Sequence, residues 1–160
     1  MTHKGGPTGA PATSVPETAV TAEIGQLLND YFAAFNDYDV DAVRTAITDG
    51  YVLYEGGSWD SDRAVSTPVS QAYGAAHVFA FVKGYNRENK VQFERLGEPI
   101  MSGDGPWLVA QVIHMTSTDP TYPNGVDGIS TLTVVDEGGT LKVARDIFVG
   151  FEVKTNRSQL

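Results

Sequence analysis

The spacing of apolar residues changes once along this chain, and that change limits the fold more than any other feature. Between Thr21 and Asn36 apolar residues recur at spacings of three and four, the pattern of one face of an amphipathic helix. The residues of this stripe are Ile24, Leu27, Leu28, Tyr31, Phe32 and Phe35. Beyond Asn89 the spacing falls to two, which is typical of strands with one buried face. Helices followed by a run of strands predict an α+β fold.

A second, shorter helix is expected after the first. Asp39 is a good N-cap residue, because its side chain can accept a hydrogen bond from the first turn. The inward-facing residues of this helix are predicted to be Val40, Val43 and Ile47. Gly50 ends it, and a short strand over 51–55 follows.

A third helix and four strands complete the predicted elements. Thr67 followed by Pro68 is typical of a helix N-terminus, after a loop over 56–66. The apolar stripe of this helix consists of Val69, Ala72, Tyr73, Ala76, Phe79 and Ala80. The strands are predicted over 90–101, 107–116, 126–136 and 141–153. We expect the three helices to pack on a curved, mostly antiparallel sheet, as a cystatin-like α+β cone that encloses a pocket.

Composition narrows both the domain organisation and the function classes. The 160 residues suit one domain over 18–153, with a flexible Gly- and Pro-rich tail over 1–17 and a C-terminal tail over 154–160. The formal charge of -9 disfavours nucleic acid and anionic membranes as partners. The chain has no cysteine, no histidine spacing typical of metal ligands and no nucleotide-binding motif, so we expect no metal and no cofactor. Because no apolar run suits a membrane span or a signal peptide, we expect a cytoplasmic protein.

The order of elements and two stretches of residues resemble a known superfamily. The first stretch is Tyr31-Phe32-Ala33-Ala34-Phe35-Asn36, followed by Asp39-Val40-Asp41-Ala42-Val43 and a short strand that ends at Glu55. The second is the last strand, with its run Arg145-Asp146-Ile147-Phe148. Over about residues 21–152 the chain resembles the nuclear transport factor 2-like superfamily. Within it the chain looks most like the small-molecule enzymes, namely ketosteroid isomerase, the SnoaL-like polyketide cyclases and limonene epoxide hydrolase.

The resemblance implies a catalytic role for three positions. Tyr31 matches the tyrosine with which ketosteroid isomerases donate a hydrogen bond to the substrate oxyanion. Glu55 matches the aspartate that shuttles the proton in those enzymes. Asp146 matches a strand aspartate that helps to activate water in the epoxide hydrolase.

The match to these enzymes is incomplete. Thr131 stands where the isomerase has a second, protonated acid, while Ile113 and Met115 stand where the hydrolase has Arg and Asp. Asp146 lies in an otherwise apolar strand, where an unpaired charge is costly. If 137–140 form a four-residue loop, Asp146 lies directly opposite Thr131, and the second acid has moved to the adjacent strand.

Each catalytic candidate also has a structural interpretation. Tyr31 lies on an apolar stripe, where the ring can pack while the hydroxyl bonds to a nearby carbonyl. Glu55 precedes two glycines and can simply be solvated at a strand end. Asp146 can be a structural carboxylate, either hydrogen-bonded or in an ion pair, with Arg145 or Lys142 as candidate partners.

Further side chains are expected to line a pocket for an apolar ligand. The predicted substrate-binding residues are Tyr54, Trp59, Phe35, Gln111, Ile113, Met115, Asp127, Ile129, Thr131 and Phe148. Of these, Asp127, Ile129 and Thr131 share a sheet face with Asp146 in the predicted register. His114 lies on the face opposite Gln111, and is a catalytic base or a structural histidine according to which face borders the pocket.

These features predict a cofactor-independent enzyme that isomerises, cyclises or hydrates an apolar, carbonyl-bearing substrate such as a polyketide or steroid. The alternatives are a non-catalytic binding protein for an apolar small molecule, or a dimeric accessory or scaffold protein of a biosynthetic pathway. We also expect a homodimer, because the sheet face away from the helices would expose an apolar patch. The residues predicted to form that patch are Leu132, Val134, Ile147 and Val149.

Overall fold

The computed structural model describes residues 17–60, 65–67 and 71–151. Apart from Glu17, which is helical, the two predicted tails lie outside these residues. Within the described ranges no helix is long and apolar enough to cross a membrane.

The first helix, α1 (Glu17–Asn36), has the buried stripe that its sequence predicts. All six stripe residues are buried in the core. The second helix, α2 (Val40–Ala46), is capped by Asp39, whose Oδ1 accepts a hydrogen bond from the backbone nitrogen of Ala42 at 3.0 Å. The prediction that Ile47 belongs to this helix is wrong, since Ile47 begins the strand β1 (Ile47–Asp60).

The third helix starts later than predicted. Residues 71–74 form the strand β3 (Gln71–Gly74), which pairs antiparallel with β1, and only then does α3 (Ala75–Phe81) begin. It continues into a π-helical turn, η1 (Val82–Asn86). The predicted helix is therefore wrong over residues 71–74, where pairing with the long strand β1 satisfies the backbone, and Val69 lies outside the described residues.

The four predicted C-terminal strands are confirmed, each described end lying within two residues of the prediction, while residues 152–153 of the last one lie outside the described residues. They are β4 (Gln92–Ser102), β5 (Trp107–Thr116), β6 (Val126–Glu137) and β7 (Thr140–Phe151). The strand order is β2-β1-β7-β6-β5-β4, where β2 is Val65–Thr67 and β3 also pairs with β1. Every pairing is antiparallel except that of β1 with β7.

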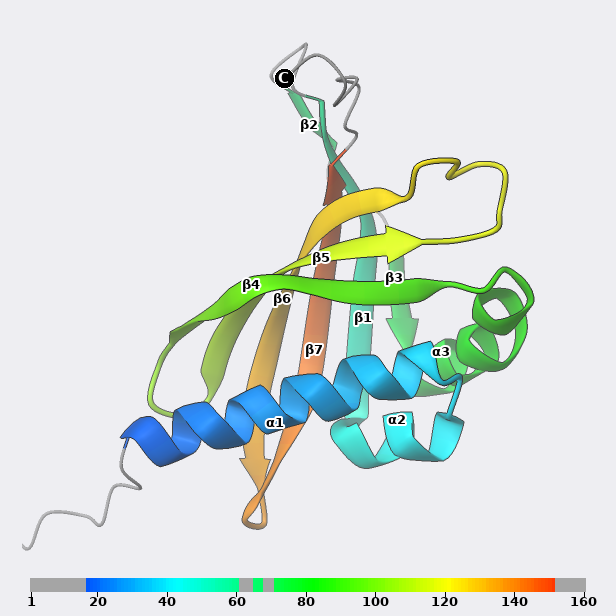
Figure 1. The fold of residues 1–160 in the computed structure, drawn as a ribbon. Helices are drawn as coiled ribbons and strands as arrows, with labels where there is room; N and C mark the ends of the chain where they lie inside the picture. Colours follow the sequence, from blue (N-terminus) through cyan, green and yellow to red (C-terminus); the bar gives the residue numbers. More distant parts are fainter. Residues whose placement is uncertain (1–16, 61–64, 68–70, 152–160) are drawn as a thin grey trace, which may run out of the picture.

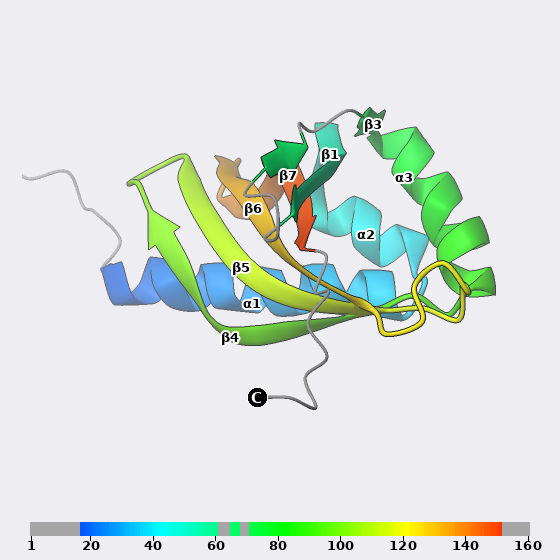
Figure 2. The same cartoon turned by 90° about the horizontal axis from the view of Figure 1, so that it is seen from above.

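The helices and the curved sheet enclose the core between them. Figure 1 shows α1 running across the front of the sheet, with α2 below its right-hand end and α3 beside and above that end. Seen from above in Figure 2, β4 and β5 curve over α1. The core contains apolar residues of all three helices and of β5, β6 and β7. The fold is therefore the predicted α+β cone, with an open and mostly antiparallel sheet.

A β-bulge in β7 decides which side chains face the core. The turn pairs Asp136 with Leu141 as predicted, but Val134 pairs with Val143 and Thr133 with Arg145, so that Ala144 is an extra residue. Asp146 consequently lies opposite Leu132, whereas the predicted partner was Thr131. A shift of one residue exchanges the two faces of the strand.

The structure also corrects the predicted apolar patch. Leu132 and Val134 are fully buried in the core, so they cannot belong to an exposed sheet face. Ile147 and Val149 pair with Thr131 and Ile129, and these half-buried residues face away from the core.

Candidate functional site

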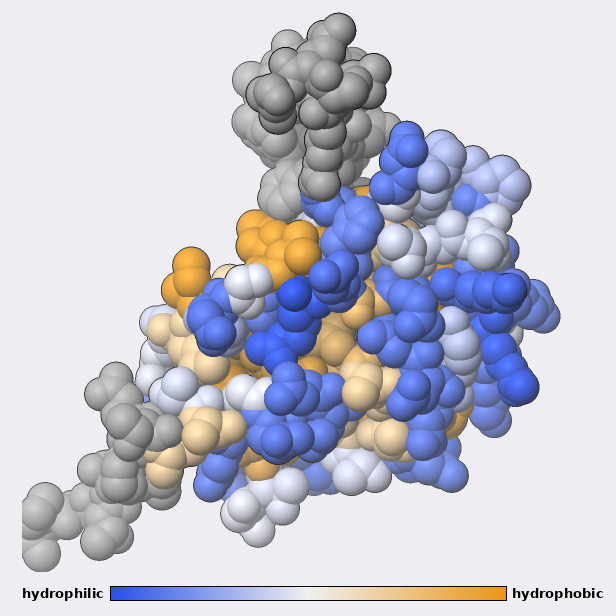
Figure 3. All heavy atoms as spheres, viewed as in Figure 1, coloured by the Kyte–Doolittle hydropathy of each residue, from blue (hydrophilic) through white to orange (hydrophobic). Residues whose placement is uncertain are grey.

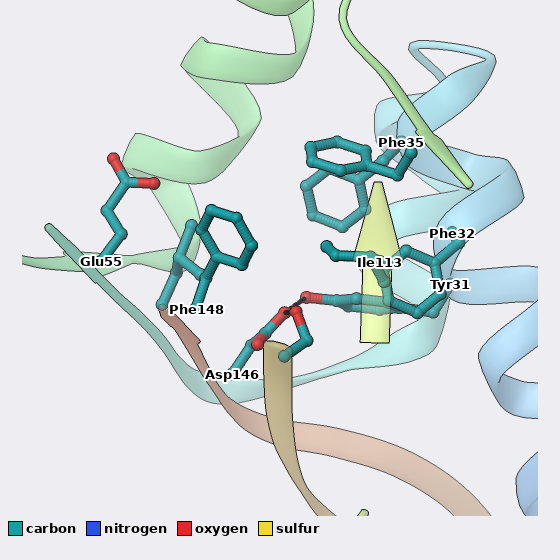
Figure 4. Close-up of a pocket in the computed structure, with 10 residues that line it drawn as sticks. Tyr31, Phe32, Phe35, Glu55, Ile113, Asp146 and Phe148 are labelled. Atoms are coloured by element: carbon teal, nitrogen blue, oxygen red, sulfur yellow. Dashed lines mark hydrogen bonds between the residues drawn. The ribbon is translucent and has the colours of Figure 1, made fainter. Parts of the chain in front are cut away.

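A pocket lies between α1 and the inner face of the sheet, with a cavity volume of about 60 Å³. Figure 4 shows the side chains that line it. They are Tyr31, Phe32, Phe35, Leu53, Glu55, Phe93, Ile113, Ser130, Asp146 and Phe148. Five of these ten residues are aromatic and two carry a carboxyl group, but none is Lys, Arg or His. The lining is therefore apolar with an acidic character.

Asp146 is the most deeply buried charged residue of this pocket, with 4% of its surface exposed. Its Oδ2 accepts hydrogen bonds from the hydroxyl of Tyr31 at 2.8 Å and from that of Ser130 at 3.4 Å. Its Oδ1 is buried and has no hydrogen-bond partner within the described part of the chain. One oxygen is therefore held by the protein, and the other has an unused capacity to accept a hydrogen bond.

Two tyrosines continue the hydrogen-bond network behind Asp146. The hydroxyl of Tyr51, a buried residue of β1, lies 2.6 Å from that of Tyr31. Because Tyr31 donates its hydrogen to Asp146, Tyr51 must be the donor between the two tyrosines. Burial and the nearby charge of Asp146 raise the pKa of both hydroxyls well above the ordinary value, so both remain neutral donors.

The environment of Asp146 raises its pKa from 3.8 to about 6. Burial is the main cause, because it disfavours the charged form, and the hydrogen bonds from Tyr31 and Ser130 offset part of this effect. The negative charge of Glu55 raises the pKa a little further. At pH 7 the ionised form exceeds the protonated form by roughly ten to one. Both forms are thus accessible near neutrality.

Glu55 lines the same pocket from β1 but lies apart from the network around Asp146. In Figure 4 it lies on the far side of Phe148 from Asp146, with its carboxylate turned away. Burial raises the pKa of Glu55. No hydrogen bond or ion pair to its carboxylate is found within the described residues.

The position of Phe148 depends on a glycine in the neighbouring strand. A Cβ atom at Gly128 would lie 2.5 Å from Cε2 of Phe148 and 2.7 Å from the carbonyl oxygen of Val149. Since real contacts are never this short, only glycine leaves the ring room to lie against β6. Gly128 thereby shapes the wall between Glu55 and Asp146.

The structure brings together six of the residues that the sequence predicted for the site. They are Tyr31, Phe35, Glu55, Ile113, Asp146 and Phe148. Gln111 faces inward but is engaged elsewhere, since its side chain bonds to Arg95 and to the backbone carbonyls of Leu96 and Gly97. Met115 is half-buried and does not line the pocket.

Four other predicted binding residues do not line the pocket. Asp127, Ile129 and Thr131 lie on the outer face of β6, since they alternate with its buried residues. The bulge in β7 places Asp146 opposite Leu132, so Asp146 does not share their face. Tyr54 alternates with the pocket residues Leu53 and Glu55 and so lies on the outer face of β1. The position of Trp59 is in β1, but its side chain is outside the described residues.

His114 also lies on the outer face, where it bonds to Asp127. The distance between Nδ1 of His114 and Oδ1 of Asp127 is 2.5 Å. Both residues are partly buried, and neither lines the pocket. This arrangement favours the structural interpretation of His114.

Sequence reasoning missed Ser130, Tyr51, Phe32, Leu53 and Phe93 as parts of the site. Phe32 could have been found, because it lies beside Tyr31 on the predicted helical stripe. Ser130 shares the inner face of β6 with the buried Leu132 and Val134. Its approach to Asp146 could not have been found, because the sequence offers no sign of the bulge in β7 that brings Asp146 to that face. For Tyr51 the sequence offered no signal of a role in the site beyond its position at the start of a predicted short strand.

Comparisons with known proteins identify the fold and do not assign a reaction. No family model and no curated protein matches the chain. Among solved structures, a nuclear transport factor 2-like protein of unknown function from Pseudomonas putida is similar, with a TM-score of 0.62 and 16% identity over 88% of this chain and 94% of that one.

Two further structures come from proteins with proposed enzymatic roles. One, proposed to be a polyketide cyclase, comes from Sinorhizobium meliloti and has a TM-score of 0.57 and 16% identity over 80% of this chain and 97% of that one. The other, proposed to be a scytalone dehydratase, comes from Novosphingobium aromaticivorans and has a TM-score of 0.60 and 11% identity over 83% and 85%. The likeness to these three structures shows that this chain has the nuclear transport factor 2-like fold.

Proposed function

We propose that this protein is a cofactor-independent enzyme that transfers protons on a small apolar molecule, with Asp146 as the group that takes and returns the proton. The observation that carries this proposal is the buried Oδ1 of Asp146, which lacks a partner in the described structure and belongs to the pocket lining. A general base works best when its pKa lies near the working pH, and that of Asp146 is about 6.

The neighbours of Asp146 suit this role. Tyr31 and Ser130 hold Oδ2, which fixes the carboxyl group and directs Oδ1 as the reactive atom. When Asp146 takes a proton, its charge no longer holds the hydrogen of Tyr31. That hydroxyl can then donate to an oxygen on which negative charge develops. Tyr51 supports the exchange by donating to Tyr31.

The reaction class is drawn from this geometry together with the fold. Removal of a proton beside a carbonyl group is the common step of isomerisation, of many cyclisations and of the loss or addition of water. The similar structures proposed to be a polyketide cyclase and a scytalone dehydratase support an enzyme of this kind. An apolar, carbonyl-bearing substrate such as a polyketide or steroid remains our proposal.

The size of the cavity bears on the substrate. A cavity of about 60 Å³ is smaller than the roughly 150 Å³ that holds benzene in an engineered protein core. Only the reacting end of a polycyclic substrate would fit beside Asp146 without movement of the lining. Phe93 and Phe148 are half-buried, so they are the rings best able to make room.

Exchange of carbon-bound hydrogen for deuterium tests the proposal without knowledge of the product. The protein is incubated in D₂O with small ketones such as butanone and cyclopentanone, and the signal of the hydrogens next to the carbonyl is followed by proton NMR. We expect the wild type to accelerate exchange and Asp146→Asn to lose about 10²- to 10⁴-fold of that acceleration. The matched control is Asp104→Asn, at an exposed position, which should retain it.

The same experiment separates catalysis from binding alone. If the wild type binds the ketones but does not accelerate exchange, the proposal is wrong and a binding protein for apolar molecules is the better description. Asp146→Asn with undiminished exchange would instead remove Asp146 from the reaction. Measuring the far-UV circular dichroism of each variant confirms that a lost rate does not reflect a lost fold.

A further inference from the structure

The charges of the pocket lining are unbalanced. Its two carboxyl groups, on Glu55 and Asp146, are accompanied by no cationic side chain among the ten lining residues. The partners of Asp146 are the neutral hydroxyls of Tyr31 and Ser130. A buried carboxylate without a cation is costly, because neutral donors compensate its lost hydration only in part.

The two carboxyl groups differ in their hydrogen-bond partners. Asp146 is fixed by two donors on Oδ2, while Glu55 has no partner within the described part of the chain. Figure 4 shows the two groups on opposite sides of Phe148, so they face different parts of a bound molecule. This arrangement separates a reacting end at Asp146 from a second end at Glu55.

A cationic group on the ligand would complement the end at Glu55. An ammonium group donates charge-assisted hydrogen bonds to a carboxylate, which are stronger than bonds between neutral groups. The ring of Phe148 beside Glu55 attracts a cation further, since aromatic faces carry negative charge density. The net charge of -9 favours the approach of cations to the protein as a whole and opposes that of anions.

We propose that the substrate of this pocket is an apolar molecule with a protonated amine, which Glu55 binds while the reacting carbon lies at Oδ1 of Asp146. This inference rests on the proposed function for the role of Asp146. Glu55 then acts as a specificity residue and not as the proton shuttle that the family resemblance implied. Carboxylate and phosphate compounds are poor ligands of the pocket.

Three small probes of four carbons each, one cationic, one neutral and one anionic, test this inference. Binding of butylamine, butanol and butyrate is measured by protein-observed NMR titration, first with the wild type. We expect butylamine to bind at least about tenfold more tightly than butanol, which corresponds to about 1.4 kcal/mol, and butyrate to bind most weakly. Glu55→Gln should lower the affinity for butylamine to that for butanol and leave the affinity for butanol unchanged.

Two variants serve as controls. Glu98→Gln makes the same change of charge at an exposed position of β4 and should keep the preference for the amine. Asp146→Asn should also keep most of it, although it removes the proposed proton transfer. Unchanged butanol binding by Glu55→Gln shows that this variant is folded and that its pocket is intact.

The inference is overturned if butanol or butyrate binds as tightly as butylamine, if butylamine does not bind at millimolar concentration, or if Glu55→Gln keeps the preference. None of these results affects the deuterium-exchange test of Asp146. Conversely, a preference for the amine that depends on Glu55, found together with no exchange activity, supports an amine-binding pocket and removes the enzymatic proposal.

Discussion

The two oxygens of a single carboxyl group, that of Asp146, have different surroundings. Oδ2 receives the hydroxyls of Tyr31 and Ser130, while Oδ1 is buried without a partner in the described structure. A carboxylate kept only for stability is normally satisfied at both oxygens, because an unsatisfied buried acceptor destabilises the fold. The unsatisfied oxygen of Asp146 therefore destabilises the fold, and the proposed proton transfer gives a reason for keeping it.

This view predicts that removing the charge stabilises the protein. The pKa of Asp146 is about 6 in the folded state, above the value of 3.8 for the unfolded chain, so the folded state holds its proton more tightly. The free energy of unfolding of the wild type should fall by up to about 3 kcal/mol as the pH rises from about 4 to 6, and then remain constant.

The variant Asp146→Asn does not titrate and should be more stable than the wild type above pH 6. The difference should shrink as the pH falls towards 4. Urea denaturation at several pH values measures it. A variant that is less stable than the wild type at pH 7 would show that Asp146 is a structural carboxylate.

Helix and strand ends in this chain depend on contacts of different range. The start of α2 is local, because Asp39 caps a backbone group only three residues away. The register of β7 depends on a distant contact, because Ala144 becomes an extra residue only when β7 pairs with β6. Local signals in the sequence can therefore be expected to locate the start of α2 correctly and to misplace the partner of Asp146 in β6.

The cap of α2 supports a prediction at this scale. Asp39→Ala removes the acceptor for the backbone nitrogen of Ala42, so the free energy of unfolding should fall by about 1 kcal/mol. Asp39→Ser should recover most of it, since serine is also a good cap. Thermal or urea denaturation measures the stability of both variants. Equal stability of Asp39→Ala and the wild type would show that packing alone holds α2.

The molecule as a whole has an apolar region on the outer face of its sheet. Its most exposed large side chains are Ile100 at 75%, Leu108 at 51% and Val112 at 42%, all on β4 and β5. On the face drawn in Figure 3, hydrophobic colour gathers at the upper left near β4, while the side of α3 is mostly hydrophilic. Exposed apolar side chains gathered on neighbouring strands favour association.

A homodimer therefore remains our prediction, although the residues that carry it differ from those expected from the sequence. Light scattering should give twice the mass of the 17.2 kDa chain. Leu108→Glu should dissociate the dimer by placing a charge in the interface. Ala33→Glu, on the exposed side of α1, is the control and should leave the dimer intact. A monomeric wild type at micromolar concentration would contradict the prediction.

The sequence by itself determined the elements with strong periodic patterns. The stripe of α1, the cap of α2 and the strands β4 to β7 all follow from residues close together in the chain. The alternation of a strand and the three-and-four spacing of a helix both arise because one face of the element is buried. An element has such a face in any fold in which it packs against a core, so the pattern can be recognised before the fold is known. The start of α3 was not determined in this way, since β3 forms only through its partner β1.

The site was determined only in part by the sequence. Tyr31 and Asp146 stood out as polar groups within apolar patterns, and the structure joins them by a hydrogen bond across 115 residues of chain. Tertiary structure alone decided that Ser130 and not Thr131 faces Asp146, because one bulged residue in β7 exchanges the faces of the strand. It also decided that Glu55 stands apart behind Phe148, because the ring of Phe148 lies over a glycine of another strand. Register and ring placement depend on the pairing of distant strands, and the pattern within a single strand does not encode them.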